Sequence, residues 1–196
     1  LFGVLLALPL GPLADMSRSA SFGATTTLEP AQVAREFTQR SWQKKDGLPD
    51  NTVQALLQTR DGFLWISTSR GLVRFDGAKF VVFDHLNVPE MVNDDCLSLA
   101  EDSAGNLWIG TADGLLRWRD GNFKRLTRKD GLAFQNDEVR DRVRLVHANR
   151  LGGVWAATVG LSWVRENSIQ NFGHAQGLVN FAFYSLHDAA DGKFWT

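Results

Sequence analysis

The residues best suited to bind a small molecule are polar side chains in short loops that recur along the chain. Five of them define a candidate ligand-binding site: Asn51, Arg70, Asp94, Asp113 and Arg140. Amide, carboxylate and guanidinium groups together suit a solute that carries hydroxyls or charges. Asp and Asn in such loops, however, more often bond to the backbone of their own turn. We therefore predict a binding face made of these loops as a region, and individual contacts mainly at Arg70, Asp113 and Arg140.

No residues have the spacing of a catalytic or metal site. The histidines share no ligand spacing such as His-x-His, and no Asp-x-Asp-x-Asp loop indicates calcium. No serine lies in a Gly-x-Ser-x-Gly context, so nucleophilic hydrolysis has no support. The single cysteine, Cys96, is expected to be a small buried side chain. We predict no catalytic residue, no metal and no cofactor. The four histidines are His85, His147, His174 and His187.

The polar loops occupy the same places in a unit that repeats along the sequence. The aligned tryptophans of its copies are Trp65, Trp108, Trp155 and Trp195. Each tryptophan lies in a short apolar run, which a tight turn and a glycine follow. Those glycines, in the first three copies, are Gly71, Gly114 and Gly160. Such runs are too short for helices and predict strand, turn and strand, with one further apolar segment before and one after.

Four antiparallel strands in about forty residues form one blade of a β-propeller. We therefore predict an all-β fold, a β-propeller of four-stranded antiparallel blades, here an incomplete ring of about three and a half blades. Apolar residues recur nine positions before each tryptophan, so the tryptophans are expected to pack between neighbouring blades. Those apolar residues are Leu56, Leu99, Val146 and Leu186. A two-layer sandwich is the alternative, but it does not need the same tryptophan in every unit.

The repeat divides the chain into segments. We assign residues 44–86 to blade 1, 87–129 to blade 2, 130–175 to blade 3 and 176–196 to the start of a fourth blade. Residues 29–43 form an N-terminal segment, which we expect to supply a strand at 36–43 that closes the last blade; a helix is the alternative. Three blades and part of a fourth cannot close a ring, so we expect the chain to be a piece of a longer protein.

The N-terminal sequence indicates where the protein is located in the cell, and the overall charge indicates which classes of partner it can bind. The first thirteen residues are apolar and uncharged, too short to span a bilayer, and resemble the hydrophobic core of a signal peptide. Residues 1–28 are therefore assigned to a leader, and export is expected. Lys and Arg number 21 against 22 acidic residues, which gives no basic surface for nucleic acid or membrane lipids.

The repeat resembles a known family. The sequences KDGLPDNTV, DGFLWISTSRGLVRF and EDSAGNLWIGTADGLLRW are similar to the two-component regulator propeller repeat, and the likeness extends over residues 37–196. The third copy departs from it, with Ala-Ala-Thr for Ile-Gly-Thr. The resemblance implies a periplasmic sensor domain of a bacterial membrane receptor, followed outside this chain by a membrane span in the inner membrane and a histidine kinase or diguanylate cyclase.

The same resemblance implies the partners. A solute, an oligosaccharide in some members, would bind on the linker face, and the receptor would act as a homodimer in two-component or cyclic-di-GMP signalling. Kinase or cyclase activity would belong to the missing segments, so we expect no enzyme activity in this chain. Two alternatives stay open: an enzyme on a propeller scaffold, either a lyase or a glycan-degrading enzyme, and a passive protein-interaction platform.

Overall fold

The computed structural model describes residues 40–133, 141–178, 183–188 and 194–195 of the 196. These residues form three four-stranded antiparallel sheets and one two-stranded sheet. The strands follow one another in sequence order within each sheet, and three single-turn 3₁₀ segments are the helical elements of the described part. The predicted all-β propeller of four-stranded blades is therefore confirmed. No helix among the described residues is long and apolar enough to cross a bilayer.

The strands are named in chain order, and each four-stranded sheet is called a blade. Blade 1 comprises β1 (Val53–Gln58), β2 (Leu64–Thr68), β3 (Gly71–Phe75) and β4 (Phe80–Phe83). Blade 2 comprises β5 (Cys96–Glu101), β6 (Leu107–Thr111), β7 (Gly114–Arg119) and β8 (Asn122–Leu126). Blade 3 comprises β9 (Leu145–Ala148), β10 (Val154–Thr158), β11 (Gly160–Arg165) and β12 (Ser168–Phe172). The two-stranded sheet pairs β13 (His187–Asp188) with β14 (Phe194–Trp195). The 3₁₀ segments are η1 (Lys44–Asp46), η2 (Arg128–Asp130) and η3 (His174–Gln176).

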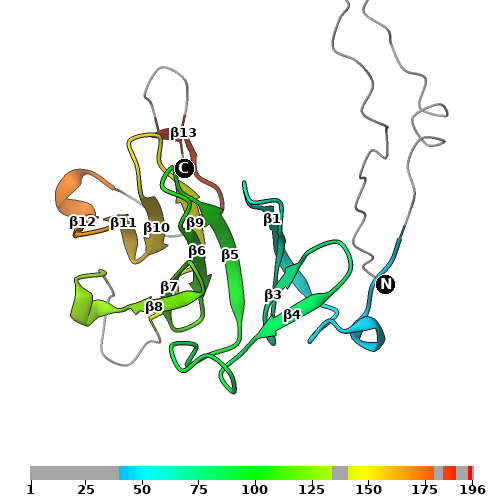
Figure 1. The fold of residues 1–196 in the computed structure, drawn as a ribbon. Coiled ribbons are helices and arrows are strands. Elements are labelled where there is room, and N and C mark those ends of the chain that lie inside the picture. The colour runs from blue at the N-terminus through cyan, green and yellow to red at the C-terminus, as the bar shows by residue number, and fades with distance from the viewer. Residues whose placement is uncertain (1–39, 134–140, 179–182, 189–193, 196) are drawn as a thin grey trace, which may run out of the picture.

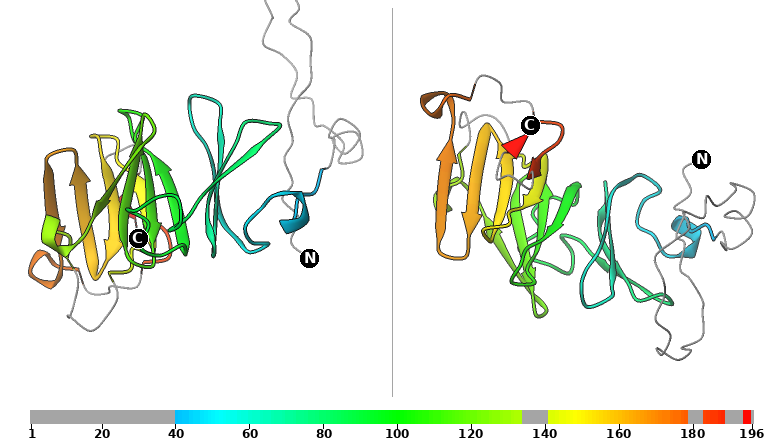
Figure 2. Two further views of the ribbon diagram at one scale, coloured as in Figure 1. Left: turned by 60° about the horizontal axis from the view of Figure 1, so that its bottom comes forward. Right: turned by 90° about the horizontal axis from the view of Figure 1, so that it is seen from above.

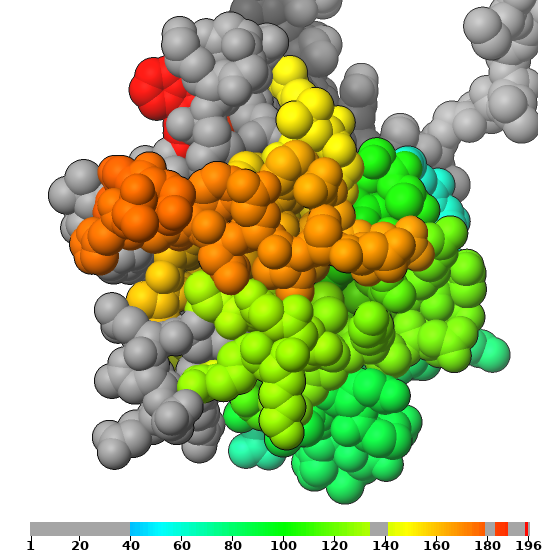
Figure 3. Space-filling view, turned by 90° about the vertical axis from the view of Figure 1, so that its left-hand side faces the viewer, coloured from blue at the N-terminus to red at the C-terminus, as the bar shows by residue number. Residues whose placement is uncertain are grey.

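The blades lie side by side, with their first strands in contact. Strand β5 lies between β1 and β9 and touches both (Figure 1). Turning the molecule shows the sheets of blades 3, 2 and 1 as successive layers (Figure 2). In the space-filling view, blade 3 (orange and yellow) lies against blade 2 (yellow-green) without a gap (Figure 3). The side chains that fill the space between layers therefore decide whether the blades hold together.

A threonine and a glycine build the turn between the second and third strands. The Thr68 hydroxyl donates to the carbonyl of Gly71 at 2.8 Å and accepts the N–H of Arg70 at 3.2 Å. Gly71 has a φ of 132°, and a Cβ there would lie 2.8 Å from the carbonyl oxygen of Phe83. Blade 2 repeats the same bonds around Thr111 and Gly114. The Thr and Gly of the repeat are thus requirements of this turn.

Tryptophans fill the space between the blades where the structure shows both neighbours. Trp65 of blade 1 is fully buried, and its ring centroid lies 4.9 Å from that of Trp118 in blade 2. Trp108 of blade 2 belongs to an apolar cluster with Val146 and Val154 of blade 3. Burying side chains of this size contributes roughly 2–3 kcal/mol each from surface removed from water.

The two later tryptophans of the repeat differ from the first two. Trp155 is half-buried, and its ring lies 5.7 Å from that of Trp163 and 5.3 Å from that of Phe172, both in blade 3. It also packs beside Phe183 in a small cluster. Trp195 in β14 is 60% exposed.

A buried carboxylate holds one of the interblade indoles in place. Asp102 is 2% exposed, and its Oδ2 accepts the indole N–H of Trp108 at 2.8 Å and the side-chain amide of Asn106 at 2.8 Å. Its Oδ1 accepts the N–H groups of Ala104 and Asn106. In blade 1 the equivalent Thr59 hydroxyl accepts the indole N–H of Trp65 at 3.2 Å. Asp102 therefore both forms the turn and orients the tryptophan.

The N-terminal expectations fall mostly outside the described residues. The predicted leader at residues 1–28 lies wholly outside them, and so does most of the segment 29–43. Residues 40–43 are described and form no strand here, and the closing strand stays a prediction, because the rest of the segment lies outside the described residues. Trp42 instead packs edge-on against Phe75, with ring centroids 5.2 Å apart.

Replacing Asp102 by Ala is predicted to lower the free energy of unfolding by about 3 kcal/mol, because buried donors lose their shared acceptor. Urea denaturation followed by tryptophan fluorescence measures this. Glu166→Ala is the control, since Glu166 is exposed in the turn after β11, and its unfolding free energy should change by less than about 0.5 kcal/mol. Equal losses in the two variants would show that Asp102 does not anchor the indole.

Candidate functional site

The loop that enters each blade docks on the turn of the blade before it. The N–H of Gly71 in blade 1 donates to the carbonyl of Asp94, in the loop leading into β5, at 2.9 Å. The N–H of Gly114 in blade 2 donates in the same way to the carbonyl of Asp141, in the loop leading into β9, at 2.5 Å. Linkers and β2–β3-type turns therefore share one edge of the sheets, which we call the linker face.

Arg70 is the predicted residue that the structure leaves most open. Its side chain is 71% exposed, and its Nε lies 3.7 Å from Oδ2 of Asp50. An exposed pair at that distance contributes little to stability. The N–H of Thr52 donates to Asp50 and lowers the pKa of that carboxyl, an effect to which the Arg70 charge also contributes. Asp50 therefore stays ionised to lower pH than a free aspartate.

Asn51 and Asp94 serve the backbone of their own loops. The side-chain oxygen of Asn51 accepts the N–H of Lys44 at 2.9 Å. Asp94 accepts the N–H of His85 at 2.8 Å, and its other oxygen lies 2.7 Å from Nδ1 of the His85 ring. Both side chains fit the alternative that Asp and Asn here form turns.

Asp113 occupies in blade 2 the position of Arg70, but it is held by a partner. Its carboxylate lies 2.7 Å from a terminal nitrogen of Arg125, whose Nε also donates to the Asp113 carbonyl at 3.0 Å. Arg140 lies outside the described residues. The next residue, Asp141, accepts from the guanidinium of Arg128 at 2.7 Å, so the linker into blade 3 is tied to the end of blade 2.

Gln54 joins a polar cluster on the linker face of blade 1, and this residue was not predicted. The side-chain amide of Gln54, at the start of β1, donates to Asp95 at 2.6 Å and to the Ser69 hydroxyl at 3.4 Å. Gln54, Ser69 and Asp95 lie beside the Arg70–Asp50 pair, because Ser69 and Arg70 are the two residues of one turn. We call these five residues the blade 1 polar cluster.

Blade 2 shows that the fold does not require these polar groups. The positions equivalent to Gln54 and Ser69, counted from the aligned tryptophans, are Leu97 and Ala112. The same backbone thus accepts apolar residues there. The signal was present in the sequence, but it appears only when the copies are compared position by position at the strand ends.

The described linker face carries polar groups of several kinds. It offers amide, hydroxyl, carboxylate and guanidinium groups, which are donors and acceptors for a polar solute. Within the described ranges no group of three or more His, Cys, Asp or Glu side chains could hold a metal ion. Cys96, behind this face, is buried, and burial, with the charges of Asp94 and Asp95, raises the pKa of its thiol.

Comparisons with known proteins bear on the family and the fold. The family model described as two component regulator propeller matches residues 47–70 and 91–113. These segments cover the linker, the first strand, the tryptophan-bearing second strand and the turn after it in blades 1 and 2. The search of curated proteins found no match.

Solved structures share the fold. The chain is similar to the extracellular domain described as that of a hybrid two component system, BT3049, from B. thetaiotaomicron, with 23% identity and a TM-score of 0.65 over 81% of this chain. A second such domain, BT4673 from the same organism, gives 23% identity and a TM-score of 0.66 over 84%. The chain spans 22% of the length of each.

A different kind of protein has the same architecture. A catalytically inactive form of virginiamycin B lyase from Staphylococcus aureus shows 14% identity and a TM-score of 0.56, covering 76% of this chain and 50% of the lyase. At these identities the likenesses show a propeller fold and nothing about a shared activity.

Substitutions of Asp94 and of Arg70 are predicted to differ in their effect on stability, because only Asp94 accepts hydrogen bonds from the protein. Asp94→Ala should lower the free energy of unfolding by about 1 kcal/mol, because the backbone N–H and the ring of His85 lose their acceptor. Arg70→Ala should change it by less than about 0.5 kcal/mol, since the side chain is exposed. Urea midpoints compare the two, and a loss at Arg70 as large as that at Asp94 would contradict this division.

Proposed function

We propose that this chain, which carries two component regulator propeller repeats, is the signal-input domain of a bacterial membrane receptor. It is exported to the periplasm and binds a polar solute, namely an oligosaccharide, at the blade 1 polar cluster. Segments outside the chain anchor the receptor in the inner membrane and carry a histidine kinase or diguanylate cyclase. Receptor protomers act as a homodimer.

The observation that carries the binding proposal is the difference between blades 1 and 2. Blade 1 places Gln54, Ser69 and Arg70 where blade 2 has Leu97, Ala112 and a paired Asp113. Exposed polar groups that the fold does not need are candidates for recognition, because loops on a rigid scaffold commonly carry function. Arg70 is the main candidate contact, since its side chain pairs only with Asp50, at 3.7 Å, among the described residues.

The groups of the cluster favour a solute rich in hydroxyls. The amide nitrogen of Gln54 already donates to Asp95 and Ser69, so Gln54 offers its amide oxygen, Ser69 a hydroxyl and Asp95 a carboxylate. Sugar hydroxyls donate and accept at once, and so match such a mixture. Arg70 adds a fixed positive charge, which also suits an acidic sugar.

Signal transfer needs only a difference in affinity between two arrangements of the receptor. A solute that binds the linker face more tightly in one arrangement of the protomers shifts the population toward it. The linkers suit this role, because the backbone N–H groups of Gly71 and Gly114 hydrogen-bond to them. A linker therefore shifts together with the turn of the preceding blade.

Binding is tested by calorimetric titration of the chain with a panel of neutral and acidic oligosaccharides. Arg70→Ala and Gln54→Ala are each predicted to weaken the affinity for a bound member about tenfold, the loss expected for one polar contact of about 1.4 kcal/mol. Arg119→Ala is the control, because Arg119 ends β7 at the opposite edge of the sheet, and its affinity should stay unchanged.

Two results would overturn the proposal. The site is wrong if an oligosaccharide binds and neither variant at the polar cluster weakens it. The sensor function is wrong if the chain converts the bound oligosaccharide to new products, because turnover favours the lyase or glycan-degrading alternative.

A further inference from the structure

A basic residue stands near the start of each linker of the chain. In the two linkers that join one four-stranded blade to the next, this residue bonds to the aspartate whose carbonyl accepts the glycine N–H of the preceding turn. The pair is His85 with Asp94 after blade 1, and Arg128 with Asp141 after blade 2. The fold therefore uses this position to close the linker loop. The four basic residues are Lys44, His85, Arg128 and His174.

His85 closes its loop with one ring nitrogen and keeps the second one over. Arg128 reaches Oδ1 of Asp141 with two nitrogens, Nε at 3.1 Å and a terminal nitrogen at 2.7 Å. His85 reaches Oδ2 of Asp94 with Nδ1 alone, at 2.7 Å. Its Nε2 makes no hydrogen bond to another described residue, and the side chain is 55% exposed. One half of the imidazole thus holds the linker, and the other half is open to a solute.

The carboxylate of Asp94 decides the chemistry of the open nitrogen. A carboxylate only accepts hydrogen bonds, so Nδ1 carries the hydrogen of the neutral ring. Nε2 is then the unprotonated nitrogen and is an acceptor. The other oxygen of Asp94 accepts the backbone N–H of His85 at 2.8 Å, so the whole carboxylate holds this one residue. Asp94 is therefore a positioning residue for an acceptor at Nε2.

His85 lies next to the blade 1 polar cluster. The carbonyl of Asp94 accepts the N–H of Gly71, the residue after Arg70, at 2.9 Å. A Cβ on Gly71 would lie 3.7 Å from the Cβ of Asp84, the residue before His85. The residue after Asp94 is itself a member of the cluster. The same short stretch of linker thus borders both the imidazole and the cluster.

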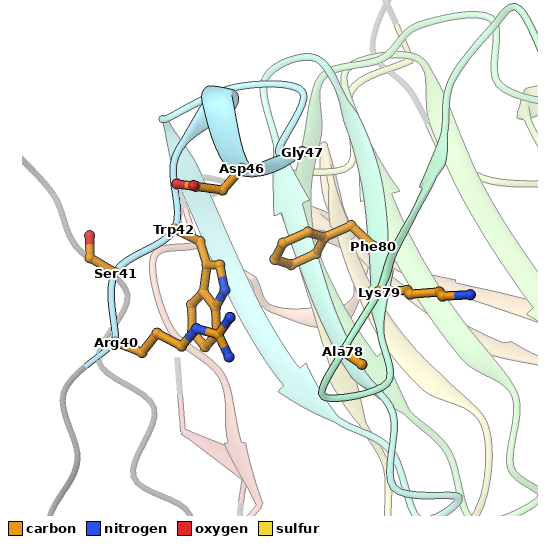
Figure 4. Close-up of a pocket in the computed structure, with 8 residues that line it drawn as sticks. All are labelled: Arg40, Ser41, Trp42, Asp46, Gly47, Ala78, Lys79 and Phe80. Atoms are coloured by element: carbon orange, nitrogen blue, oxygen red, sulfur yellow. The ribbon is translucent and has the colours of Figure 1, made fainter.

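A pocket away from the linker face is a competing place for a sugar. It has a volume of 490 Å³ and lies between Trp42 and Phe80, which point toward one another (Figure 4). Two of its charged groups are engaged: the Arg40 guanidinium lies over the Trp42 ring at 5.2 Å, and Asp46 accepts a backbone N–H of its own turn at 2.8 Å. Phe80 begins β4, whereas His85 follows the far end of that strand. Substitutions can therefore separate the two places.

We propose that His85 is a specificity-determining contact of the blade 1 polar cluster, with Nε2 accepting a hydrogen bond from a hydroxyl of the bound oligosaccharide. Asp94 fixes the tautomer that makes this possible. The inference rests on the proposed function, because it extends the same binding site. It also names what the site selects, namely a sugar with a hydroxyl facing His85 over the deoxy sugar that lacks it.

Two variants separate the ring nitrogens. In His85→Asn the side-chain amide can still donate to Asp94 from the place of Nδ1, but nothing replaces Nε2. In His85→Gln the amide oxygen reaches the place of Nε2. Calorimetric titration with the panel of neutral and acidic oligosaccharides is predicted to show an about tenfold loss of affinity in His85→Asn, as for one polar contact, and less than about threefold in His85→Gln. Arg40→Ala, in the pocket, is the control and should bind like the wild type.

The results distinguish failure of this inference from failure of the proposed function. Binding that Arg70→Ala weakens and that both His85 variants leave unchanged overturns the role of His85 alone. A loss of affinity in Arg40→Ala alone assigns the sugar to the pocket and overturns both. Absence of binding by every member of the panel also overturns both.

Nitrogen NMR of the histidine ring tests the tautomer and does not require a His85 variant to fold. In the wild-type protein at about pH 8.5, where imidazoles are neutral, Nε2 of His85 should resonate as an unprotonated nitrogen and shift when the oligosccharide that binds is added. In Asp94→Ala a hydrogen should appear on Nε2, a change that a merely structural role of Asp94 would not produce. A hydrogen on Nε2 in the wild type, or an Nε2 signal that saturating oligosaccharide leaves unmoved, overturns the inference.

Discussion

The structure depends on burial of one indole between each pair of neighbouring sheets. A four-stranded blade has two apolar faces and no second layer of its own, so its side chains leave water only when another blade covers them. Trp65 is fully buried because Leu107 and Trp118 of blade 2 lie against it, and Trp108 because Val146 and Val154 of blade 3 do the same. A large rigid aromatic group contributes much buried area for little side-chain entropy.

Polar contacts then fix how the layers meet. Thr59 and Asp102 accept the indole N–H groups of Trp65 and Trp108, so these two indoles are held in one orientation and their buried donors are paired. At the linker face, the bonds from Gly71 and Gly114 set the distance between a turn and the next linker. The side chains left for recognition are the few on the linker face that neither hold an indole nor join a turn to a linker. Arg70 is the clearest of them.

Much of the fold was readable from the sequence, because the repeat fixes several constraints at once. The spacing of the tryptophans, the apolar residues nine positions earlier and the glycine after each turn agree only for stacked four-stranded units. The individual site residues were less predictable. Arg70 and Asp113 occupy equivalent positions, yet only Asp113 is held, because its partner Arg125 lies on the fourth strand, where blade 1 has Val82. Such pairings depend on contacts across the sheet, which sequence spacing does not show.

The most direct test of the interblade packing is a double-mutant cycle between Trp65 and Trp118, the two rings that meet across blades 1 and 2. Trp65→Leu, Trp118→Leu and the double variant are compared by their free energies of unfolding in urea. Direct contact between the indoles predicts a coupling of about 1 kcal/mol, the usual value for an aromatic pair. Strictly additive losses would contradict the account, because the two indoles would then not stabilise the blades through each other.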